Sequence, residues 1–223
     1  MTEIKNSNFK DLPEIAECHR SAFPDSLSSK MGNRYLSKMI EWYLSGEKKF
    51  LFHAVEDGKI VGYCGGMIND GTQATGSASG MIQYSFNYAV ISIALRPWLL
   101  FHKEFQSKLT LISKNIRRKL GLKKKKKSNS AAKSSVSSDV RNISKSAEPV
   151  AGLVVIGVSK EYMGKGYGSI LLQEFEKKSK EMNIKQMALS VKSENKKAIK
   201  SYERNGWVIT KETGDYYEME KTI

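Results

Sequence analysis

Two segments near the start of the chain repeat apolar residues at the three- and four-residue spacing of an amphipathic helix. Residues 11–23 do so after Asp11, with Pro13 and Glu14 in what would be the first turn. Residues 33–44 repeat the pattern through Leu36, Ile40 and Tyr43. Asp is a preferred N-cap, and Pro and Glu are favoured in a first turn, so the sequence predicts two helices, the first capped by Asp11.

The pattern changes further along to that of β-strands with helices between them. Residues 50–68, FLFHAVEDGKIVGYCGGMI, are two apolar runs joined at Asp57-Gly58, a pair that favours a tight hairpin turn. Residues 150–158, VAGLVVIGV, form a nearly continuous apolar run, as in a strand covered on both faces. The remaining predicted elements are a helix ending near Met182, a strand at 186–191, a helix at 195–204 and paired strands at 208–211 and 216–219.

Three glycines alternate directly before the helix that follows the 150–158 strand. Gly164, Gly166 and Gly168 fall in YMGKGYGSILLQEF, residues 162–175. Glycine inside a helix costs about 1 kcal/mol relative to alanine, so this cluster indicates a sharp turn or a close approach of the backbone to something else. The unpaired N–H groups and positive dipole end of a helix N-terminus suit a phosphate. The spacing is that of neither a dinucleotide-binding fold nor a P-loop.

The net charge of +14 belongs almost entirely to one segment. Residues 102–145 hold 14 Lys and Arg against Glu104 and Asp139, which leaves +2 for the rest of the 223-residue chain. The rest is therefore expected to be a near-neutral globular body with one core. Cys18 and Cys64 match no metal-ligand spacing, and the first residues lack a signal-peptide pattern, so we expect no metal site, no disulfide and a cytoplasmic location.

The stretch after the next predicted strand makes the glycine loop more specific. Residues 193–207, SENKKAIKSYERNGW, have the arrangement N-x-x-A-x-x-x-Y-x-x-x-G-aromatic from Asn195 to Trp207. With the strand VVIGV and the loop MGKGYGSILL, this stretch resembles the GNAT superfamily of acetyl-CoA-dependent N-acetyltransferases. The resemblance implies an α/β fold with a mixed, mostly antiparallel central sheet flanked by helices. It divides the chain into two parts of one domain, residues 1–70 and 149–223, around an insertion at residues 71–148.

The resemblance implies acetyl-CoA as co-substrate and a role for each part of the motif. The loop amides would hold the coenzyme A pyrophosphate, and they belong to Gly164, Lys165, Gly166, Tyr167, Gly168 and Ser169. A main-chain N–H at Ile156 or Val158 would polarise the thioester carbonyl, and Tyr202 would be the general acid for the departing thiolate. Asn195 would either meet the pantetheine or pyrophosphate arm or cap its own helix. A simple tight turn for the loop, and a packing role for Tyr202, remain alternatives.

Two positions depart from the family pattern. Met163 stands where many members have Arg or Gln, which removes one polar contact but leaves the amides available. Many members also carry a glutamate base in the strand before the loop, whereas residues 150–158 contain no carboxylate and Gly152 occupies the expected position. The general base is therefore unassigned, and the candidates are Glu148, Asp70, His19, His53 and an ordered water.

The insertion contains the basic segment. Its residues Phe101, Phe105, Leu109, Ile112 and Ile116 recur at helical spacing among Lys and Arg, which predicts a basic amphipathic helix before a disordered Lys/Ser tract. The apolar run before it, residues 81–95, is shorter than the 18 or more residues of a spanning helix. We expect residues 86–127 to lie on an anionic membrane surface, at its inner face, or to pack on the enzyme's own core. Nucleic acid is disfavoured, because the lysine run is not interleaved with aromatic residues.

The resemblance to GNAT acetyltransferases implies an acceptor that is an amine-bearing small molecule or glycan. The insertion is similar to those of bacterial GNAT members in surface-polysaccharide pathways, which implies an amino sugar of a glycan precursor. Two alternatives stay open: a protein N-terminal or lysine acetyltransferase, and a non-catalytic module that binds acetyl-CoA without turnover. The intact Tyr202 and glycine loop argue against the last. For the insertion, a lid and a dimer contact remain alternatives to membrane binding.

Overall fold

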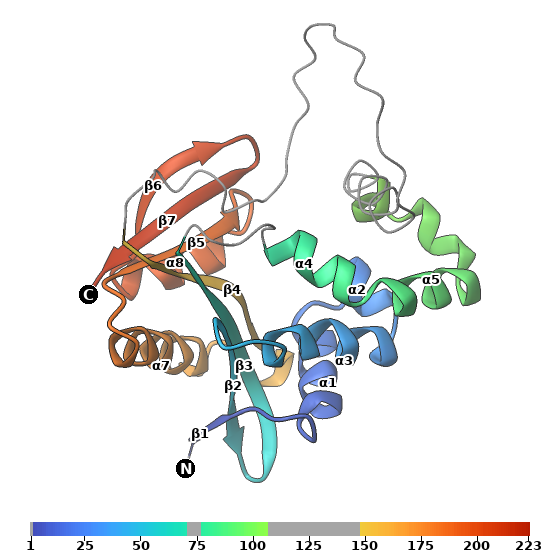
Figure 1. Ribbon diagram of the computed structural model, residues 1–223, viewed down its shortest axis with the longest axis horizontal. Helices are drawn as coiled ribbons and strands as arrows, with labels where there is room; N and C mark the ends of the chain where they lie inside the picture. The colour runs from blue at the N-terminus through green and yellow to red at the C-terminus, as the bar shows by residue number, and fades with distance from the viewer. Residues whose placement is uncertain (1, 71–76, 107–147) are drawn as a thin grey trace, which may run out of the picture.

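The computed structural model describes residues 2–70, 77–106 and 148–223, and in them the chain forms one seven-stranded sheet with helices on both faces (Figure 1). The strands are β1 (Glu3–Asn6), β2 (Lys49–Glu56), β3 (Lys59–Asn69), β4 (Val150–Val158), β5 (Gln186–Lys192), β6 (Val208–Thr213) and β7 (Tyr216–Thr222). The helices are α1 (Leu12–Ala22), α2 (Leu27–Lys30), α3 (Asn33–Glu41), α4 (Ser77–Tyr84), α5 (Phe86–Leu95), α7 (Tyr167–Glu181) and α8 (Lys196–Arg204), with 3-10 turns η1 (Trp42–Leu44), η2 (Pro97–Phe101) and η3 (Lys160–Tyr162).

The sheet is mixed and mostly antiparallel, as predicted. Its strand order is β1-β2-β3-β4-β5-β7-β6, and among these strands only β4 and β5 pair in parallel. The predicted elements from residue 150 onward are all present, with ends within three residues of the predicted ones. The predicted hairpin is present too, because Asp57 and Gly58 have the φ values of 49° and 75° that a type I′ turn requires.

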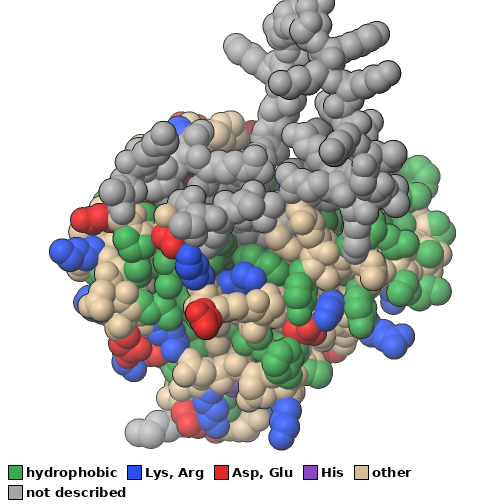
Figure 2. All heavy atoms as spheres, in the orientation of Figure 1, with side chains coloured by type: hydrophobic (Ala, Val, Ile, Leu, Met, Phe, Trp, Pro, Cys, Tyr) green, Lys and Arg blue, Asp and Glu red, His purple; other side chains and the backbone are tan. Residues whose placement is uncertain are grey.

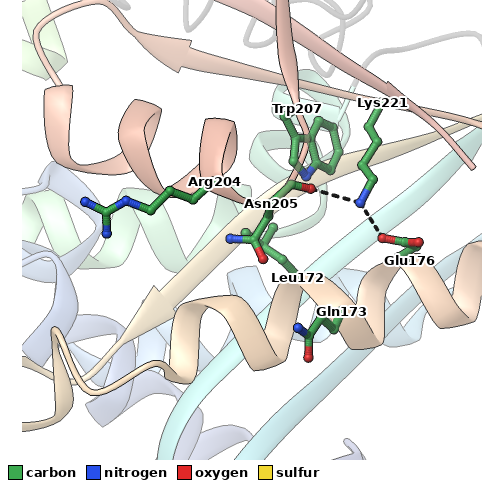
Figure 3. A pocket seen from close by; sticks show the side chains of 7 residues that line it. All are labelled: Leu172, Gln173, Glu176, Arg204, Asn205, Trp207 and Lys221. Atoms are coloured by element: carbon green, nitrogen blue, oxygen red, sulfur yellow. Dashed lines mark hydrogen bonds and ion pairs between the residues drawn. The ribbon is translucent and has the colours of Figure 1, made fainter.

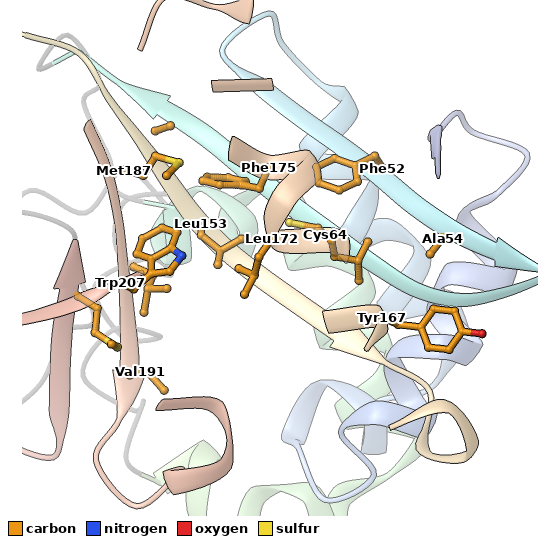
Figure 4. Packing of buried hydrophobic residues seen from close by; sticks show 14 of the residues in the cluster. Phe52, Ala54, Cys64, Leu153, Tyr167, Leu172, Phe175, Met187, Val191 and Trp207 are labelled. Carbon is orange, nitrogen blue, oxygen red and sulfur yellow. The ribbon is translucent and has the colours of Figure 1, made fainter. Parts of the chain in front are cut away.

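Two buried clusters hold the helices against the sheet. On one face, α7 contributes Leu171, Leu172 and Phe175 to a core that also contains Trp207 (Figure 4). On the other face, α1 and α3 pack on Tyr63 of β3. Figure 1 shows α7 on the opposite side of the sheet from α1 and α3. Burial on both faces explains why the β4 sequence is apolar almost without interruption.

The chain leaves and re-enters the sheet at neighbouring positions around the predicted insertion. Asn69, at the end of β3, is the register partner of Val150, at the start of β4. Between them, Leu99 and Phe105 are buried against Leu27, Met31 and Tyr35 of the α2–α3 region. The described part of this segment is therefore anchored to the body of the protein. No helix among the described residues is both long and apolar enough to cross a membrane.

Some local expectations need correction. Asp11 precedes α1, but its carboxylate accepts the N–H of Asn8 at 2.8 Å and caps no helical N–H. The basic helix predicted to run from Phe101 does not begin there, because Phe101 ends η2 and the next helical turn starts at Lys103. Phe101 is 79% exposed and Phe105 8%, so the two do not share one apolar face. Leu109, Ile112, Ile116 and the Lys/Ser tract lie outside the described residues.

Among the elements not predicted from the sequence are β1 and α2. The strand β1 reads EIKN and is largely exposed at the sheet edge, so it has no apolar alternation to reveal it. The helix α2 is one turn long and is capped by Ser26, whose hydroxyl accepts the N–H of Ser29. A single turn is too short to show a helical period.

Candidate active site

The glycine loop joins β4 to α7 and leaves the start of that helix open. Gly164 and Gly166 have φ values of 80° and 92°, in the left-handed region that side chains disfavour. A Cβ atom at either position would meet no other atom within 4 Å, so the loop faces open space. Among the described residues, the N–H groups of Gly164, Gly166, Tyr167 and Gly168 have no hydrogen-bond acceptor. Those of Lys165 and Ser169 bond to Tyr162 and Gly166, at 3.4 and 2.9 Å.

The sheet opens beside this loop, because β4 and β5 separate before β4 ends. Their parallel ladder runs only from Val150↔Gln186 to Leu153↔Leu189. β4 continues to Val158 along β3, whereas β5 continues along β7. A β-bulge in β4 at Val154, opposite Gly65 and Gly66, coincides with the point of separation. The last residues of β4 therefore form an edge in the middle of the sheet.

The hydrogen-bond pattern shows which backbone groups face this open edge. The N–H of Ser159 donates to the carbonyl of Val61 at 2.9 Å, which makes these two a bonded pair. Bonded and non-bonded pairs alternate along an antiparallel ladder, so Gly157 is also bonded to β3. Ile156 and Val158 are in non-bonded pairs, and their N–H and C=O groups point away from β3. These are the two residues proposed from the sequence to meet the thioester.

Tyr202 lies on α8 and packs against the core beneath α7. Its ring centroid is 6.3 Å from that of Trp207. Burial, and to a lesser extent the Cys64 thiol, raises the pKa of the Tyr202 phenol above its ordinary value. The cluster against which Tyr202 packs includes Cys64, the register partner of Ile156, so the phenol lies in the part of the core next to the opening edge. Its hydroxyl hydrogen-bonds to nothing in the described parts of the chain, which leaves it available as a proton donor.

The second sequence motif frames α8. Asn195 is the N-cap, and its side chain accepts the N–H of Ala198 at 3.2 Å. At the other end Gly206 has a φ of 80°, and its N–H donates to the carbonyl of Glu203. The Asn195 side chain is therefore engaged in the helix cap, which was one of the two roles expected for it.

Asn205, which the sequence analysis did not single out, ties α8 to the start of α7. Its side-chain amide donates to Ser169 Oγ at 3.1 Å and to the carbonyl of Ser201 at 2.8 Å. The Asn-Gly pair just before the aromatic residue is a helix-end signal that could have identified it. A cavity of about 280 Å³ lies beside it between α7, α8 and β7 (Figure 3). In it Lys221 bridges Glu176 and the carbonyl of Asn205, while Arg204 points away from that ion pair.

Two of the four residues considered as the general base lie far from the open edge. Asp70 follows β3 and pairs with Lys48, and Glu148 precedes β4 in an exposed position. Both are at the Val150 end of β4. With about 3.3 Å per residue along a strand, that end is about 20 Å from Ile156. Neither carboxylate is positioned to act at the edge.

The two histidines are buried on the α1 side of the sheet. His19 Nδ1 is 2.5 Å from the Tyr63 hydroxyl, and its Nε2 is 3.1 Å from Ser28 Oγ. Burial lowers the pKa of His19 to about 4, and it also lowers the pKa of His53, which bonds to Ser7 at 2.8 Å. Tyr63 is the register partner of Gly157, so His19 is connected to the final residues of β4 through one phenol. The partners Tyr63 and Ser28 have no local sequence signal, because folding alone brings them to His19.

The site as a whole combines a loop with unpaired N–H groups, an unpaired strand edge and a half-buried phenol. The described residues contain no cluster of His, Cys, Asp and Glu that could hold a metal ion. The arrangement can hold a phosphate at the α7 N-terminus and polarise a carbonyl group with a strand N–H.

Comparison with known proteins gives a family and a fold. The model of the acetyltransferase (GNAT) family matches residues 134–207, which contain β4, the glycine loop, α7, β5 and α8. No curated protein matches the chain. Solved structures with a similar fold include PaiA N-acetyltransferase from Thermoplasma acidophilum in complex with coenzyme A, at 16% identity and a TM-score of 0.55, covering 100% of this chain and 99% of that one.

Two further structures are similar over the same extent. Arabidopsis thaliana NAA60 in complex with acetyl-CoA has 15% identity and a TM-score of 0.55, with 100% of this chain and 99% of that chain covered. The ribosomal-protein-S18-alanine N-acetyltransferase from Escherichia coli has 14% identity and a TM-score of 0.53, with 100% and 94% covered. At these identities the likeness concerns the fold, whereas the family match concerns the site itself. Residues 134–207 therefore match the acetyltransferase (GNAT) family, and two of these structures of similar fold hold coenzyme A or acetyl-CoA.

Proposed function

We propose that this protein transfers the acetyl group of acetyl-CoA to a primary amine at the open edge between β4 and β5. The observation that carries the proposal is the end of the β4–β5 ladder at Leu153↔Leu189, next to a helix start with unpaired N–H groups. A thioester placed along this edge can accept a hydrogen bond from Ile156 or Val158. The pyrophosphate of the same molecule can reach the amides of residues 164–169.

The proposed reaction is a direct attack of the amine on the thioester. The amine nitrogen forms a bond to the carbonyl carbon, and the carbon–sulfur bond then breaks. The strand N–H stabilises the charge that develops on the carbonyl oxygen. The thiolate leaves with the electron pair of the broken bond and takes the Tyr202 hydroxyl proton. Burial keeps that phenol protonated until the thiolate forms beside it.

The group that acts as general base limits which acceptor amines can react. Glu148 and Asp70 are distant from the edge, β4 carries no carboxylate, and His19 is hydrogen-bonded on both nitrogens. We therefore propose that water removes the proton from the amine. This suits an amine that is weakly basic and so partly neutral near pH 7. An amino sugar meets that requirement better than a lysine side chain, whose reference pKa is near 10.4.

A membrane surface is the location we propose for this acceptor, in a cytoplasmic enzyme. Seven of the twelve large hydrophobic residues exposed in the described chain lie in α5 and η2: Tyr88, Val90, Ile91, Leu95, Trp98, Leu100 and Phe101. Figure 2 shows hydrophobic side chains gathered at the edge of the molecule formed by α5. The chain continues from this patch into the segment that holds most of the net charge. An apolar patch next to basic residues is typical of proteins that bind anionic lipid.

The decisive experiment measures release of free coenzyme A with different acceptors. Amino sugars, peptides with free N-termini or lysines, and polyamines are supplied side by side with acetyl-CoA. The proposal expects turnover with amino sugars in preference to the other two classes. Preferred turnover of peptides would favour the protein acetyltransferase. Acetyl-CoA binding without turnover of any acceptor would favour the non-catalytic module.

A further inference from the structure

A second hollow lies on the opposite face of the sheet from α7, between the end of α1, the start of α3 and α5. Its volume is about 460 Å³, within the usual range for small-molecule sites. Three arginines from different elements line it, and so do apolar side chains of α5; these residues are Arg20, Arg34, Arg96, Tyr88, Ile91 and Leu95. A site with cationic groups on one wall and an apolar surface on another suits an anion attached to a larger organic group.

Two of the three guanidinium groups have no carboxylate partner in the described parts of the chain. Arg20 pairs with Glu17 at 2.9 Å, whereas Arg34 and Arg96 form no ion pair there. Arg96 donates to the carbonyl of Met31 at 3.1 Å, which holds its side chain in place. The guanidinium lies so close to Gly32 that a Cβ atom there would be 3.2 Å from Arg96 Nη2. Arg96 is therefore positioned before any ligand arrives.

The backbone and one buried side-chain atom add to this recognition surface. Helix α3 begins at the hollow with Gly32 as its N-cap, and no side chain caps its first N–H groups. The helix dipole there favours an anion. Asn33 Oδ1 is buried and has no hydrogen-bond partner in the described structure. A buried acceptor without a donor is costly, and a ligand hydroxyl or ammonium group would satisfy it.

The end of α1 connects this hollow to the open edge of β4. Ser21, next to Arg20, accepts the N–H of Lys160 just beyond β4 at 3.0 Å. Phe23 and Ala22 lie against Gly157, where a Cβ atom would be 3.0 and 3.4 Å from them. The hollow and the proposed thioester position are thus on either side of one short segment, at the same end of β4.

We propose that this hollow binds the acceptor through a phosphate group, with Arg34 and Arg96 as its main ligands and Asn33 accepting a hydrogen bond from a hydroxyl of the sugar. This inference rests on the proposed acetyl transfer and specifies its substrate class as phosphorylated amino sugars. The apolar wall formed by Ile91 and Leu95 would contact the group that carries the phosphate. Bidentate geometry makes an arginine the suitable residue for this contact.

Binding can be tested without turnover. Glucosamine 1-phosphate and glucosamine are each titrated calorimetrically into the full chain saturated with coenzyme A. We expect the phosphate ester to bind at least about tenfold more tightly than the neutral sugar, since a charge-assisted hydrogen bond contributes that much. Arg34→Gln should lower the affinity for the phosphate ester about tenfold, because it removes one of the two main phosphate ligands. The variant should remain folded, because the exposed Arg34 side chain has no partner in the described structure.

The matched control is Lys59→Gln. Lys59 is exposed at the β2–β3 turn, where the next residue contacts Glu14 in the first turn of α1, which is about 9 Å along the helix from Arg20. The Lys59→Gln substitution removes the same unit of charge without changing the hollow. The affinity of this variant for glucosamine 1-phosphate should equal that of the unaltered chain. Equal losses of phosphate affinity in both variants would overturn the proposal.

Two further measurements separate this inference from the proposed reaction. Arg34→Gln should keep its affinity for acetyl-CoA, while Tyr202→Phe should bind the sugar phosphate normally and fail only in turnover. The titration is repeated with glucosamine linked through pyrophosphate to a nucleoside or to a short polyprenyl chain, to distinguish the carriers of the phosphate. Arg34-dependent binding of any of the three supports the hollow as a phosphate site. Failure of all three refutes it even if acetyl transfer to neutral amines is observed.

Discussion

The backbone N–H of Trp207 donates to the carbonyl oxygen of Tyr202 at 3.1 Å, and this bond fastens the proposed general acid to the hydrophobic core. With the Gly206-to-Glu203 bond of 3.0 Å, it forms a Schellman motif. Trp207 is 3% exposed, and its ring centroid is 6.4 Å from that of Phe175 in α7. The position of Tyr202 thus depends on a glycine and a tryptophan that do not face the reacting groups.

Gly206→Ala should weaken both the fold and the reaction. A Cβ atom would fit sterically, since only the Lys221 side chain lies within 4 Å, but the φ of 80° would cost about 1–2 kcal/mol. Urea unfolding should show this loss, and turnover should fall because the end of α8 relaxes. Gly46→Ala is the control, since its added atom meets only the end of Lys49 and no strain is expected. Equal stability of the two variants would remove the role assigned to Gly206.

Gly166→Val should abolish tight acetyl-CoA binding while the protein remains folded. The side chain would occupy the space in front of the open N–H groups and would disfavour the φ of 92°. Gly58→Val is matched to it, because Gly58 has a φ of 75°, also has no atom within 4 Å, and lies at the distant hairpin turn. Calorimetry should find at least about a tenfold loss of affinity for the first variant only. Unchanged affinity in Gly166→Val would show that the loop does not hold the coenzyme.

Tyr202→Phe should keep coenzyme affinity and lower the rate of the chemical step by about 10²–10⁴-fold, the usual effect of losing a positioned proton donor. The rate must be measured in single turnovers, because product release could otherwise hide the change. Tyr84→Phe loses a hydroxyl that bonds to Glu41 at 2.6 Å, away from the open edge, and should react normally. A Tyr202→Phe rate equal to that of the unaltered chain would leave Tyr202 with packing alone.

Stability should fall on mild acidification because His19 is buried in its neutral form. Its pKa is lowered from 6.5 to about 4, so between these values the unfolded chain binds a proton that the folded chain does not. The contribution of neutral His19 to the free energy of unfolding is fully present above pH 6.5. It is lost as the pH falls toward 4, and the total loss is about 3 kcal/mol. Urea unfolding between pH 7 and 5 should detect the decline before most carboxylates are protonated. His53 acts in the same direction.

Variants identify the histidine responsible for that decline. His19→Gln should unfold more easily at pH 7, since it loses the contact with Tyr63, but its stability should change less between pH 7 and 5. His102→Gln should keep the full decline. If His19→Gln showed the same pH dependence as the unaltered chain, the decline would have to come from other groups.

Vesicle binding should depend on the exposed aromatic residues beside the basic segment. Trp98 and Phe101 are 63% and 79% exposed, so replacing both by Gln should weaken binding to anionic vesicles and leave the melting temperature unchanged. Phe9→Gln removes an equally exposed ring, at 64%, from another surface and should bind as before. Co-sedimentation at rising salt should show partial loss of binding, because apolar contacts are not screened. Equal binding by all variants would exclude this patch as the contact. Deletion of the whole segment is less informative, because Leu99 and Phe105 are core residues.

The elements that the sequence predicted best are those specified by neighbouring residues. The hairpin needed only Asp57-Gly58, and α8 needed only an N-cap and a glycine after its last turn. The glycine loop of the family motif is also specified by neighbouring residues, because the loop and the helix that follows it are continuous in the sequence. Such signals can be recognised without knowing which strands pair, whereas β1 and α2, with no local signal of this kind, were missed.

The class of enzyme could be predicted from the sequence alone, since its motifs, like the loop proposed to hold the coenzyme, consist of neighbouring residues. The folded structure was needed to show that the β4–β5 ladder ends at Leu153, that Ile156 and Val158 point into the opening, and that Asp70 and Glu148 lie at the far end of β4. It also brought Arg20, Arg34 and Arg96 to one hollow, although up to 76 positions separate them in the chain. The physical reason is that register, bulges and helix packing result from burying apolar surface over the whole molecule, and no local pattern records their outcome.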